Sequence, residues 1–319
     1  MKKVGNIYDQ ICSLDNIRLA DAIACKGKSA QYGVQAHNKH KEANIQQLHV
    51  DLVNQAFQTS SYSTFKVYEP KERLVYRLPY FPDRICHHAI MNVLEPIFVA
   101  NFTTDTYSCI KGKGIHAAAN ALRRSLRDQP GTLYCLKLDI VKFYPSVSHP
   151  ILKKLLRRKF KDQKLLHLLD GIINSATGLP IGNYLSQYFA NFYLSYFDHW
   201  IKEVKQVKHY FRYADDLVIL SPSKEHLHQL LADIKQYLSQ HLKLTIKNNY
   251  QVFPVASRGI DFVGYVFYHT HTRLRKTIKQ NFARKVAKGI SPASLASYNG
   301  WIKHCNGKHL TKKLTPYDN

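Results

Sequence analysis

Two adjacent carboxylates inside a β-hairpin pattern constrain the fold of this 319-residue chain more than any other feature. They belong to the segment Tyr213-Ala214-Asp215-Asp216. Apolar, β-prone runs cover residues 209–212 and 217–220, so the simplest local structure is a strand, a tight acidic turn and a second strand. Adjacent carboxylates repel each other and would gain by binding a cation. An Asp-rich surface turn is also common, so a second element is needed to favour chemistry.

That second element is the apolar run over residues 133–140, which carries Asp139 near its end. A central strand rarely ends on an unpaired carboxylate, because burying an unpaired charge is costly. If this strand lies beside the acidic hairpin, Asp139 and Asp215 can share two metal ions, with Asp216 close by. Two metal ions a few Å apart would activate a 3′-hydroxyl and stabilise a pyrophosphate leaving group in an in-line phosphoryl transfer.

Four motifs follow one another in a familiar order. They are Asp139 with Phe143-Tyr144, Gly182-Asn183-Tyr184-Leu185-Ser186-Gln187, Tyr213-Ala214-Asp215-Asp216, and Phe262-Val263-Gly264-Tyr265. This series resembles that of a reverse transcriptase, from about residue 66 to about residue 310. The resemblance implies an α+β right-hand polymerase fold with fingers, a palm whose antiparallel sheet packs on helices, and a short helical thumb. It places the N-terminal segment and fingers at residues 1–130, the palm at 131–268 and a basic thumb at 269–319.

The middle motif departs from the commonest pattern. Most reverse transcriptases carry Gln-Gly-x-x-x-Ser-Pro, whereas this chain has Ile181-Gly182 and Ser186-Gln187. That variant resembles the enzymes of diversity-generating retroelements, which copy a template RNA with frequent errors at adenines and feed the cDNA into a variable gene. The resemblance implies two Mg²⁺ ions, template RNA, a DNA or RNA primer, cDNA and dNTPs. It also implies a small, basic, oligomeric accessory protein as partner.

The resemblance assigns roles to residues matched one by one. The catalytic residues are Asp139, Asp215 and Asp216, and the metal ligands are these three with Ile140. The residues expected to bind the incoming dNTP are Lys71, Arg73, Phe143, Tyr144, Ile181, Gln187 and Lys247. The residues expected to bind template or primer are Arg84, Lys111, Lys113, Gly182, Ser186, Tyr213, Gly264, Arg273, Arg275 and Lys276.

Several of these residues also have an ordinary structural interpretation. Lys71 and Arg73 could be exposed cations of a solvated turn. Tyr144 could be a core aromatic instead of a ring that clashes with a 2′-hydroxyl and so selects dNTPs over rNTPs. Residues 242–247 alternate as a strand, so Lys247 could be an exposed strand lysine instead of a proton donor to pyrophosphate. The basic residues from Arg273 onward predict a helical region that grips the duplex backbone.

Charge is the outstanding bulk property. The chain has 46 Lys and Arg against 22 Asp and Glu, a formal net charge of +24 and a pI near 9.7. Such a surplus predicts a polyanionic partner and salt-sensitive binding. The charges are spread along the chain instead of forming one amphipathic helix, and no apolar run approaches the length of a membrane span. No signal peptide is evident, and six unpatterned cysteines suit a cytoplasmic protein of a bacterium or phage.

Other functions stay open at this point. The chain could be another bacterial reverse transcriptase, of the retron, group II intron or phage-defence kind. It could also be an RNA-binding protein that keeps the polymerase fold without turnover, which the charge would suit equally well. Retention of three carboxylates argues against that alternative, because acids beside a nucleic acid repel it unless a metal is bound. A palm-type cyclase is disfavoured by the basic thumb and by Ser186-Gln187.

Overall fold

A computed structural model describes residues 3–68 and 72–314, apart from the side chains of residues 308, 311 and 312. The chain divides into two compact units that interleave along the sequence. The first comprises Met1–Thr103, Lys142–Tyr196 and Gln240–Leu244, and the second comprises Thr104–Val141, Phe197–Ser239 and Thr245–Asn319. The expected fingers, palm and thumb are three contiguous segments, whereas each of the two units combines segments that are separate in sequence. The bounds of the fingers, palm and thumb therefore stay a prediction.

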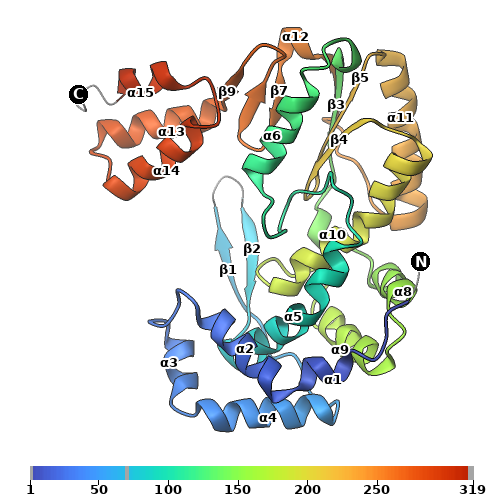
Figure 1. Cartoon of the computed structure of the whole chain (residues 1–319), viewed down its shortest axis with the longest axis vertical. Coiled ribbons are helices and arrows are strands. Elements are labelled where there is room, and N and C mark those ends of the chain that lie inside the picture. Colours follow the sequence, from blue (N-terminus) through green and yellow to red (C-terminus); the bar gives the residue numbers. More distant parts are fainter. Residues whose placement is uncertain (1–2, 69–71, 315–319) are drawn as a thin grey trace. The chain divides into compact units, whose positions relative to one another are not determined.

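The first unit is mainly helical (Figure 1). Its helices are α1 (Tyr8–Cys12), α2 (Leu14–Cys25), α3 (Tyr32–Asn38), α4 (Lys41–Val53), the helical turn η1 (Tyr80–Arg84), α5 (Ile85–Val99), α7 (Phe143–Ser146), α8 (His149–Lys159), α9 (Gln163–Asn174) and most of α10 (Tyr184–His199). Local capping explains where some of them begin. The side chain of Ser13 accepts the Asn16 N–H at the start of α2, and Asp162 accepts the Leu165 N–H at the start of α9.

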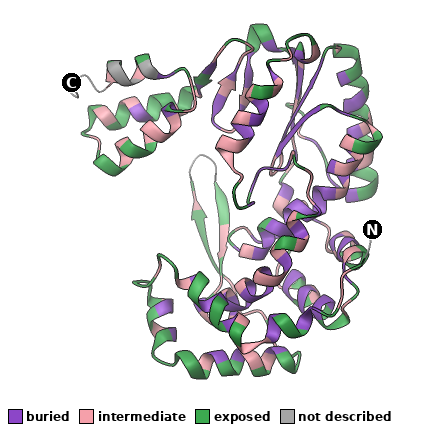
Figure 2. Cartoon of the chain, in the orientation of Figure 1, coloured by how far each residue is buried: buried purple, intermediate pink, exposed green. Residues whose placement is uncertain are grey.

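A two-stranded antiparallel hairpin, β1 (Ser63–Val67) and β2 (Arg73–Arg77), also belongs to the first unit. Arg73, one of the residues expected to bind the incoming dNTP, is the first residue of β2. Only Val67, Val75 and Tyr76 are half-buried in its strands, and the remaining strand residues are exposed (Figure 2). A two-stranded hairpin with two exposed faces has few contacts to stabilise it on its own.

The second unit is built on a four-stranded antiparallel sheet in the order β4 (His209–Tyr213), β5 (Asp216–Ser221), β3 (Tyr134–Asp139) and β6 (Gln251–Pro254). Side chains alternate between its two faces. On one face, Cys135 and Val218 join a core with α6 (Ile115–Ser125). Helix α11 (Lys224–Tyr237), followed by the turn η4 (Leu238–Leu242), packs against β3, β5 and β6 on the other side of the sheet (Figure 1). Because Lys137 and Asp139 share the parity of Cys135, they point to the α6 face.

A second, three-stranded sheet follows, formed by β7 (Ile260–Phe262), β8 (Tyr265–Phe267) and β9 (Thr272–Leu274). The short helices α12 (Val255–Arg258), α13 (Lys276–Ala287), α14 (Pro292–Ile302) and α15 (Lys308–Leu314) complete the unit. The motif Phe262-Val263-Gly264-Tyr265 forms the turn between β7 and β8, since Phe262 pairs with Tyr265. Across the described residues 3–68 and 72–314, no helix combines the length and apolar character needed to cross a bilayer.

Two expectations about local structure were wrong. Arg273 lies on strand β9 instead of in a helix, because Thr272 and Leu274 alternate inward and pair with β8. Residues 242–247 do not form a strand, since Lys243 has a φ of 54° and only Ile246 makes an isolated bridge, to Ile140. The segment is held instead by single hydrogen bonds at the end of β3.

Candidate active site

Strand register brings the three acidic residues together in the second unit. Asp139 is the last residue of β3 and lies directly opposite Asp216, the first residue of β5. Tyr213 ends β4 and pairs with Asp216, which leaves Ala214 and Asp215 as the two turn residues. Directly opposite residues of an antiparallel pair have their Cβ atoms about 5 Å apart. The fold therefore gathers the carboxylates that the sequence motifs singled out.

Lysine and arginine side chains flank these acids. Lys247 Nζ lies 2.7 Å from Asp139 Oδ2, so the residue expected at the nucleotide is here the ion partner of a carboxylate. Lys137 Nζ lies 3.7 Å from Asp216 Oδ2 and also donates to the Asp261 carbonyl. Arg275 Nε donates to Asp261 Oδ1 at 2.7 Å. Sequence reasoning missed Lys137, although its position two residues before Asp139 places it on the same face of the sheet.

Burial and neighbouring negative charges raise the pKa values of the two aspartates in the turn. Burial, reinforced by the charge of Asp139, raises the pKa of Asp215 to about 6. Burial raises the pKa of Asp216 to about 7, and the neighbouring Lys137 opposes that rise only in part. Both carboxyl groups therefore hold protons more strongly than ordinary aspartates, because burial disfavours the ionised form.

The acids also fit a divalent cation chemically. Asp139 Oδ1 and Asp216 Oδ1 are buried, and neither has a hydrogen-bond partner among the residues that the structure describes. Within the same residues, no group of three His, Cys, Asp or Glu side chains is arranged around a single metal position. Mg²⁺ is commonly held by one or two carboxylates together with substrate phosphates. The donor set thus suits Mg²⁺ ions that share their ligands with a nucleotide.

These pKa shifts predict how pH changes stability. A carboxyl whose pKa is raised in the folded state stabilises the fold below its unfolded pKa, and this contribution is lost as pH rises through the folded pKa. Asp216→Asn should therefore gain thermal stability relative to the wild type between about pH 4 and pH 7, and remain more stable above that window, by roughly 3 °C. Thermal melts in EDTA measure this difference. At pH 8, added Mg²⁺ should raise the melting temperature of the wild type and not that of the variant; equal responses would contradict the assignment.

Residues expected at the incoming nucleotide lie in the first unit, apart from Lys247. Phe143 is buried and Tyr144 is half-buried, with their rings edge to face at a centroid distance of 5.8 Å. Arg73 and Gln187 are exposed, whereas Ile181 is half-buried. Lys71 lies outside the described residues. The burial of Phe143 leaves Tyr144 as the ring of the two that can face a ligand.

Hydrogen bonds from other segments fix the loop before α10, residues 181–183. The Tyr76 N–H donates to the Ile181 carbonyl at 2.7 Å, and a Cβ at Gly182, where φ is 116°, would collide with the Tyr76 carbonyl oxygen. Asn183 Nδ2 donates to the Tyr62 hydroxyl at 2.8 Å. Ser186 is buried in the first turn of the helix. The structure thus adds Tyr62 to the surroundings of the motif loop, through its contact with Asn183.

Some of the residues expected to bind template or primer are exposed, whereas others make hydrogen bonds or ion pairs within the chain. The exposed group is Lys111, Arg273 and Lys276, while Arg84 and Tyr213 are half-buried. Lys113 is engaged, because its Nζ donates to the carbonyls of Thr104 and Thr106 at 2.9 and 3.0 Å. Arg275 is held by Asp261. Gly264 has a φ of 91°, and the ring of Trp301 fills the space that a Cβ would need, so this glycine also serves packing.

The chain is similar to known proteins over most of its length. Residues 68–267 match the family model described as reverse transcriptase (RNA-dependent DNA polymerase). The chain is 24% identical to Protein YkfC of Escherichia coli over 279 residues, which cover 71% of this chain and 73% of that protein. It is 20% identical to the group II intron-encoded protein LtrA of Lactococcus lactis, covering 59% of this chain and 43% of that protein.

Among solved structures, telomerase from Candida albicans, in complex with a fragment of telomeric RNA, superposes with a TM-score of 0.50 at 13% identity. The match covers 83% of this chain and 58% of the telomerase chain. The present chain therefore spans less than two thirds of the length of LtrA and of this telomerase. The predicted α+β right-hand polymerase fold is confirmed. The chain belongs to the reverse transcriptase (RNA-dependent DNA polymerase) family.

Proposed function

We propose that this protein extends a DNA or RNA primer with dNTPs on an RNA template, using Asp139, Asp215 and Asp216 with two Mg²⁺ ions. The observation that supports this proposal best is the register of β3 and β5, which sets Asp139 opposite Asp216 and leaves one buried oxygen of each without a hydrogen-bond partner among the described residues. The carbonyl of Ile140 is the fourth expected ligand. When bound, Mg²⁺ supplies activation of the 3′-hydroxyl and stabilises the charge on the pyrophosphate.

The residues of the chain perform the remaining tasks. Lys247 and Lys137 neutralise Asp139 and Asp216 before the substrate arrives, which lowers the repulsion that a triphosphate would otherwise meet. Lys247 is also placed to give charge or a proton to the departing pyrophosphate. Arg73 offers its guanidinium to the triphosphate from the exposed hairpin, and the buried Phe143 supports the ring of Tyr144 beneath the sugar.

Within the family, we favour the diversity-generating retroelement type, whose product is a cDNA mutated at adenines. The support comes from the motif loop. Ile181 and Gln187 stand where most family members have Gln and Pro, and the exposed Gln187 amide lies in the first turn of α10. An apolar side chain at one position and a flexible amide at the other would hold the nascent base pair less tightly. A small, basic, oligomeric accessory protein is the expected partner, with the template RNA.

A group II intron-type enzyme is the second candidate, because LtrA is described as a group II intron-encoded protein and is among the relatives of this chain. The two candidates differ in fidelity. The intron-type enzyme would make accurate cDNA, whereas the retroelement enzyme would misincorporate opposite template adenines.

Primer extension on an RNA template of mixed composition, with Mg²⁺ and all four dNTPs, tests the proposal. The reaction is run alone and with any small basic protein encoded beside this chain, and the cDNA is sequenced. Errors concentrated opposite adenines support the retroelement type, and accurate cDNA supports the intron type. Tight RNA binding without any extension, under every condition, would overturn polymerisation and favour an RNA-binding protein.

A further inference from the structure

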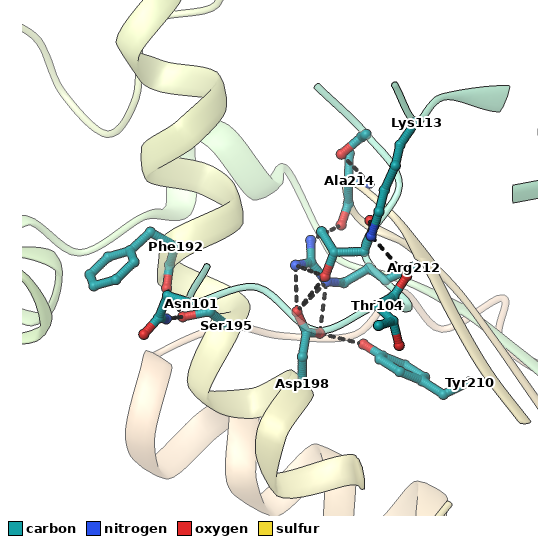
Figure 3. A network of polar contacts seen from close by, with 11 residues as sticks. Asn101, Thr104, Lys113, Phe192, Ser195, Asp198, Tyr210, Arg212 and Ala214 are labelled. Atoms are coloured by element: carbon teal, nitrogen blue, oxygen red, sulfur yellow. Dashed lines mark hydrogen bonds and ion pairs between the residues drawn. The ribbon is translucent and has the colours of Figure 1, made fainter. Parts of the chain in front are cut away.

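The backbone of Ala214, in the acidic turn, is held by hydrogen bonds at both its N–H and its carbonyl. Its N–H donates to Ser108 Oγ at 3.0 Å, and its carbonyl accepts from Arg212 Nη1 at 3.1 Å. Ser108 is only 2% exposed and Arg212 is fully buried, so neither group exchanges these contacts freely with water. Figure 3 shows the Arg212 guanidinium between the Asp198 carboxylate and the Ala214 carbonyl.

These two hydrogen bonds hold Ala214 in a backbone conformation that alanine does not favour. Ala214 has a φ of 54°, in the left-handed region that residues with a Cβ seldom occupy. Such a residue persists only where its surroundings hold it in place. Asp215 and Asp216 follow directly, so the direction in which their carboxylates point depends on this backbone conformation.

The Arg212 guanidinium is itself held in place by Asp198. Arg212 Nε donates to Asp198 Oδ1 at 2.8 Å, and Nη2 lies 2.5 Å from Asp198 Oδ2. The hydroxyls of Tyr210 and Thr106 donate to the same carboxylate at 2.6 and 3.1 Å. Both charged residues are fully buried. A buried ion pair is weak support for stability, since well-packed apolar residues of similar size often stabilise a fold as well or better. The pair therefore calls for another explanation.

Ser108 is positioned by the same part of the chain. The Tyr107 N–H donates to the Arg212 carbonyl at 3.0 Å, and the Arg212 N–H donates to the Asp105 carbonyl at 2.9 Å. Lys113 Nζ bonds the carbonyls of Thr104 and Thr106, as Figure 3 shows for Thr104. The segment of residues 104–108 thus runs along the edge of β4 and carries the serine to the turn.

We propose that Arg212, oriented by Asp198, and Ser108 are positioning residues that hold the backbone of Ala214 in its left-handed conformation and so aim Asp215 and Asp216 at the metal ions. None of the three is a catalytic residue. The inference deepens the proposed function and rests on it where polymerisation is the readout. We call Ser108, Arg212 and Asp198 together the Ala214 clamp. The inference assigns Lys113 to the support of this clamp instead of to template binding.

A double-mutant cycle between Ser108→Ala and Ala214→Gly tests the serine arm. Ser108→Ala should keep the fold and lower kcat about 10-fold with little change in the KM for dNTP, which corresponds to about 1.4 kcal/mol. Ala214→Gly alone should stay within about 3-fold of wild type, because glycine adopts this conformation without strain. The double variant should recover most of the lost kcat. Losses that simply multiply in the double variant would overturn the proposal.

Ser221→Ala is the matched control. Ser221 is a buried serine at the far end of β5, and its Oγ accepts the Ser223 N–H at 3.2 Å. The control should lose as much thermal stability as Ser108→Ala while its kcat stays unchanged. A parallel fall in kcat would show that any lost buried hydrogen bond has this effect, which would also contradict a positioning role.

The arginine arm is tested by removing both buried charges together. Asp198→Leu with Arg212→Met should fold, because no unpaired charge is left behind, yet kcat should fall about 100-fold. Retention of wild-type kcat in the folded double variant would overturn this arm.

Mn²⁺ binding to the free protein, followed by calorimetry, separates failure of the clamp from failure of the proposed function. Ser108→Ala should weaken Mn²⁺ binding about 5-fold and Ala214→Gly should restore it, whether or not the protein extends a primer. If the wild type binds Mn²⁺ but makes no cDNA, the proposed function fails and the clamp is still decided by this cycle. Unchanged binding in Ser108→Ala, or no binding in the wild type, would overturn the clamp.

Discussion

Asp215→Asn should abolish RNA-templated primer extension, lowering kcat by about 1,000-fold or more, while the protein stays folded. Two metal ions supply several kcal/mol of transition-state stabilisation, and loss of about 4 kcal/mol corresponds to a factor of about 1,000 in rate. Asparagine keeps the size of the side chain but removes the charge that would hold a cation. Single-turnover extension of a labelled primer on RNA measures the effect.

The same substitution should not weaken the metal-free fold. Burial and the charge of Asp139 raise the pKa of Asp215, which means that the ionised side chain is unfavourable in the folded state. Removing its charge should therefore leave the thermal stability unchanged or slightly higher at pH 8. An activity loss combined with unchanged stability would separate a chemical role from a structural one.

Asp233→Asn provides the control for this substitution. Asp233 lies on α11 in the same unit and pairs with Lys205 at 2.7 Å, so it is an aspartate with a cationic partner away from the acidic turn. Its substitution should change kcat by less than about 2-fold, since surface ion pairs contribute little. Extension by Asp215→Asn above a few per cent of the wild type would contradict the assignment of this carboxylate.

The central hairpin could be predicted from the sequence because its physics is local. Apolar runs flank Asp215 and Asp216, and a similar apolar run precedes Asp139, so pairing of the two elements follows from the need to bury both. The structure added only the register. The four ordered motifs then supplied the fold class.

The clamp could not be predicted, because its parts are distant in sequence and each looks ordinary alone. Arg212 lies in an apolar run, and the hydrophobic pattern shows it only as a single polar residue of a strand. Its partner, Asp198, belongs to α10, and Ser108 precedes a different helix. Hydrophobic periodicity reports which face of an element is buried, but it does not report which polar group of another element meets it.

The error at residues 242–247 has a related cause. Alternation of Leu242, Leu244 and Ile246 is typical of a strand, and all three side chains are indeed buried. The backbone is not extended throughout, since Lys243 adopts a φ of 54° and the N–H of Lys247 donates to the Asp139 carbonyl. The same departure brings the Lys247 side chain to Asp139, so the irregular backbone serves the site.

Replacement of Tyr144 by alanine should let the enzyme use ribonucleotides. The aromatic ring is expected beneath the sugar, where a 2′-hydroxyl would clash with it, and rejection of one substrate by such a clash is a common source of specificity. We expect the preference for dNTP over rNTP to fall about 100-fold, or roughly 3 kcal/mol, with kcat for dNTP lowered much less. Competition between dNTP and rNTP on one RNA template measures this ratio.

Tyr144→Phe is the informative partner of that variant, because it keeps the ring and removes the hydroxyl. The ring of Tyr144 meets the buried Phe143 edge to face, and this ring contact is kept when the hydroxyl is removed. Selection should therefore survive in Tyr144→Phe and be lost in Tyr144→Ala. If both variants lose selection, the hydroxyl makes the distinction by hydrogen bonding; if neither does, Tyr144 is a supporting aromatic and another group faces the sugar.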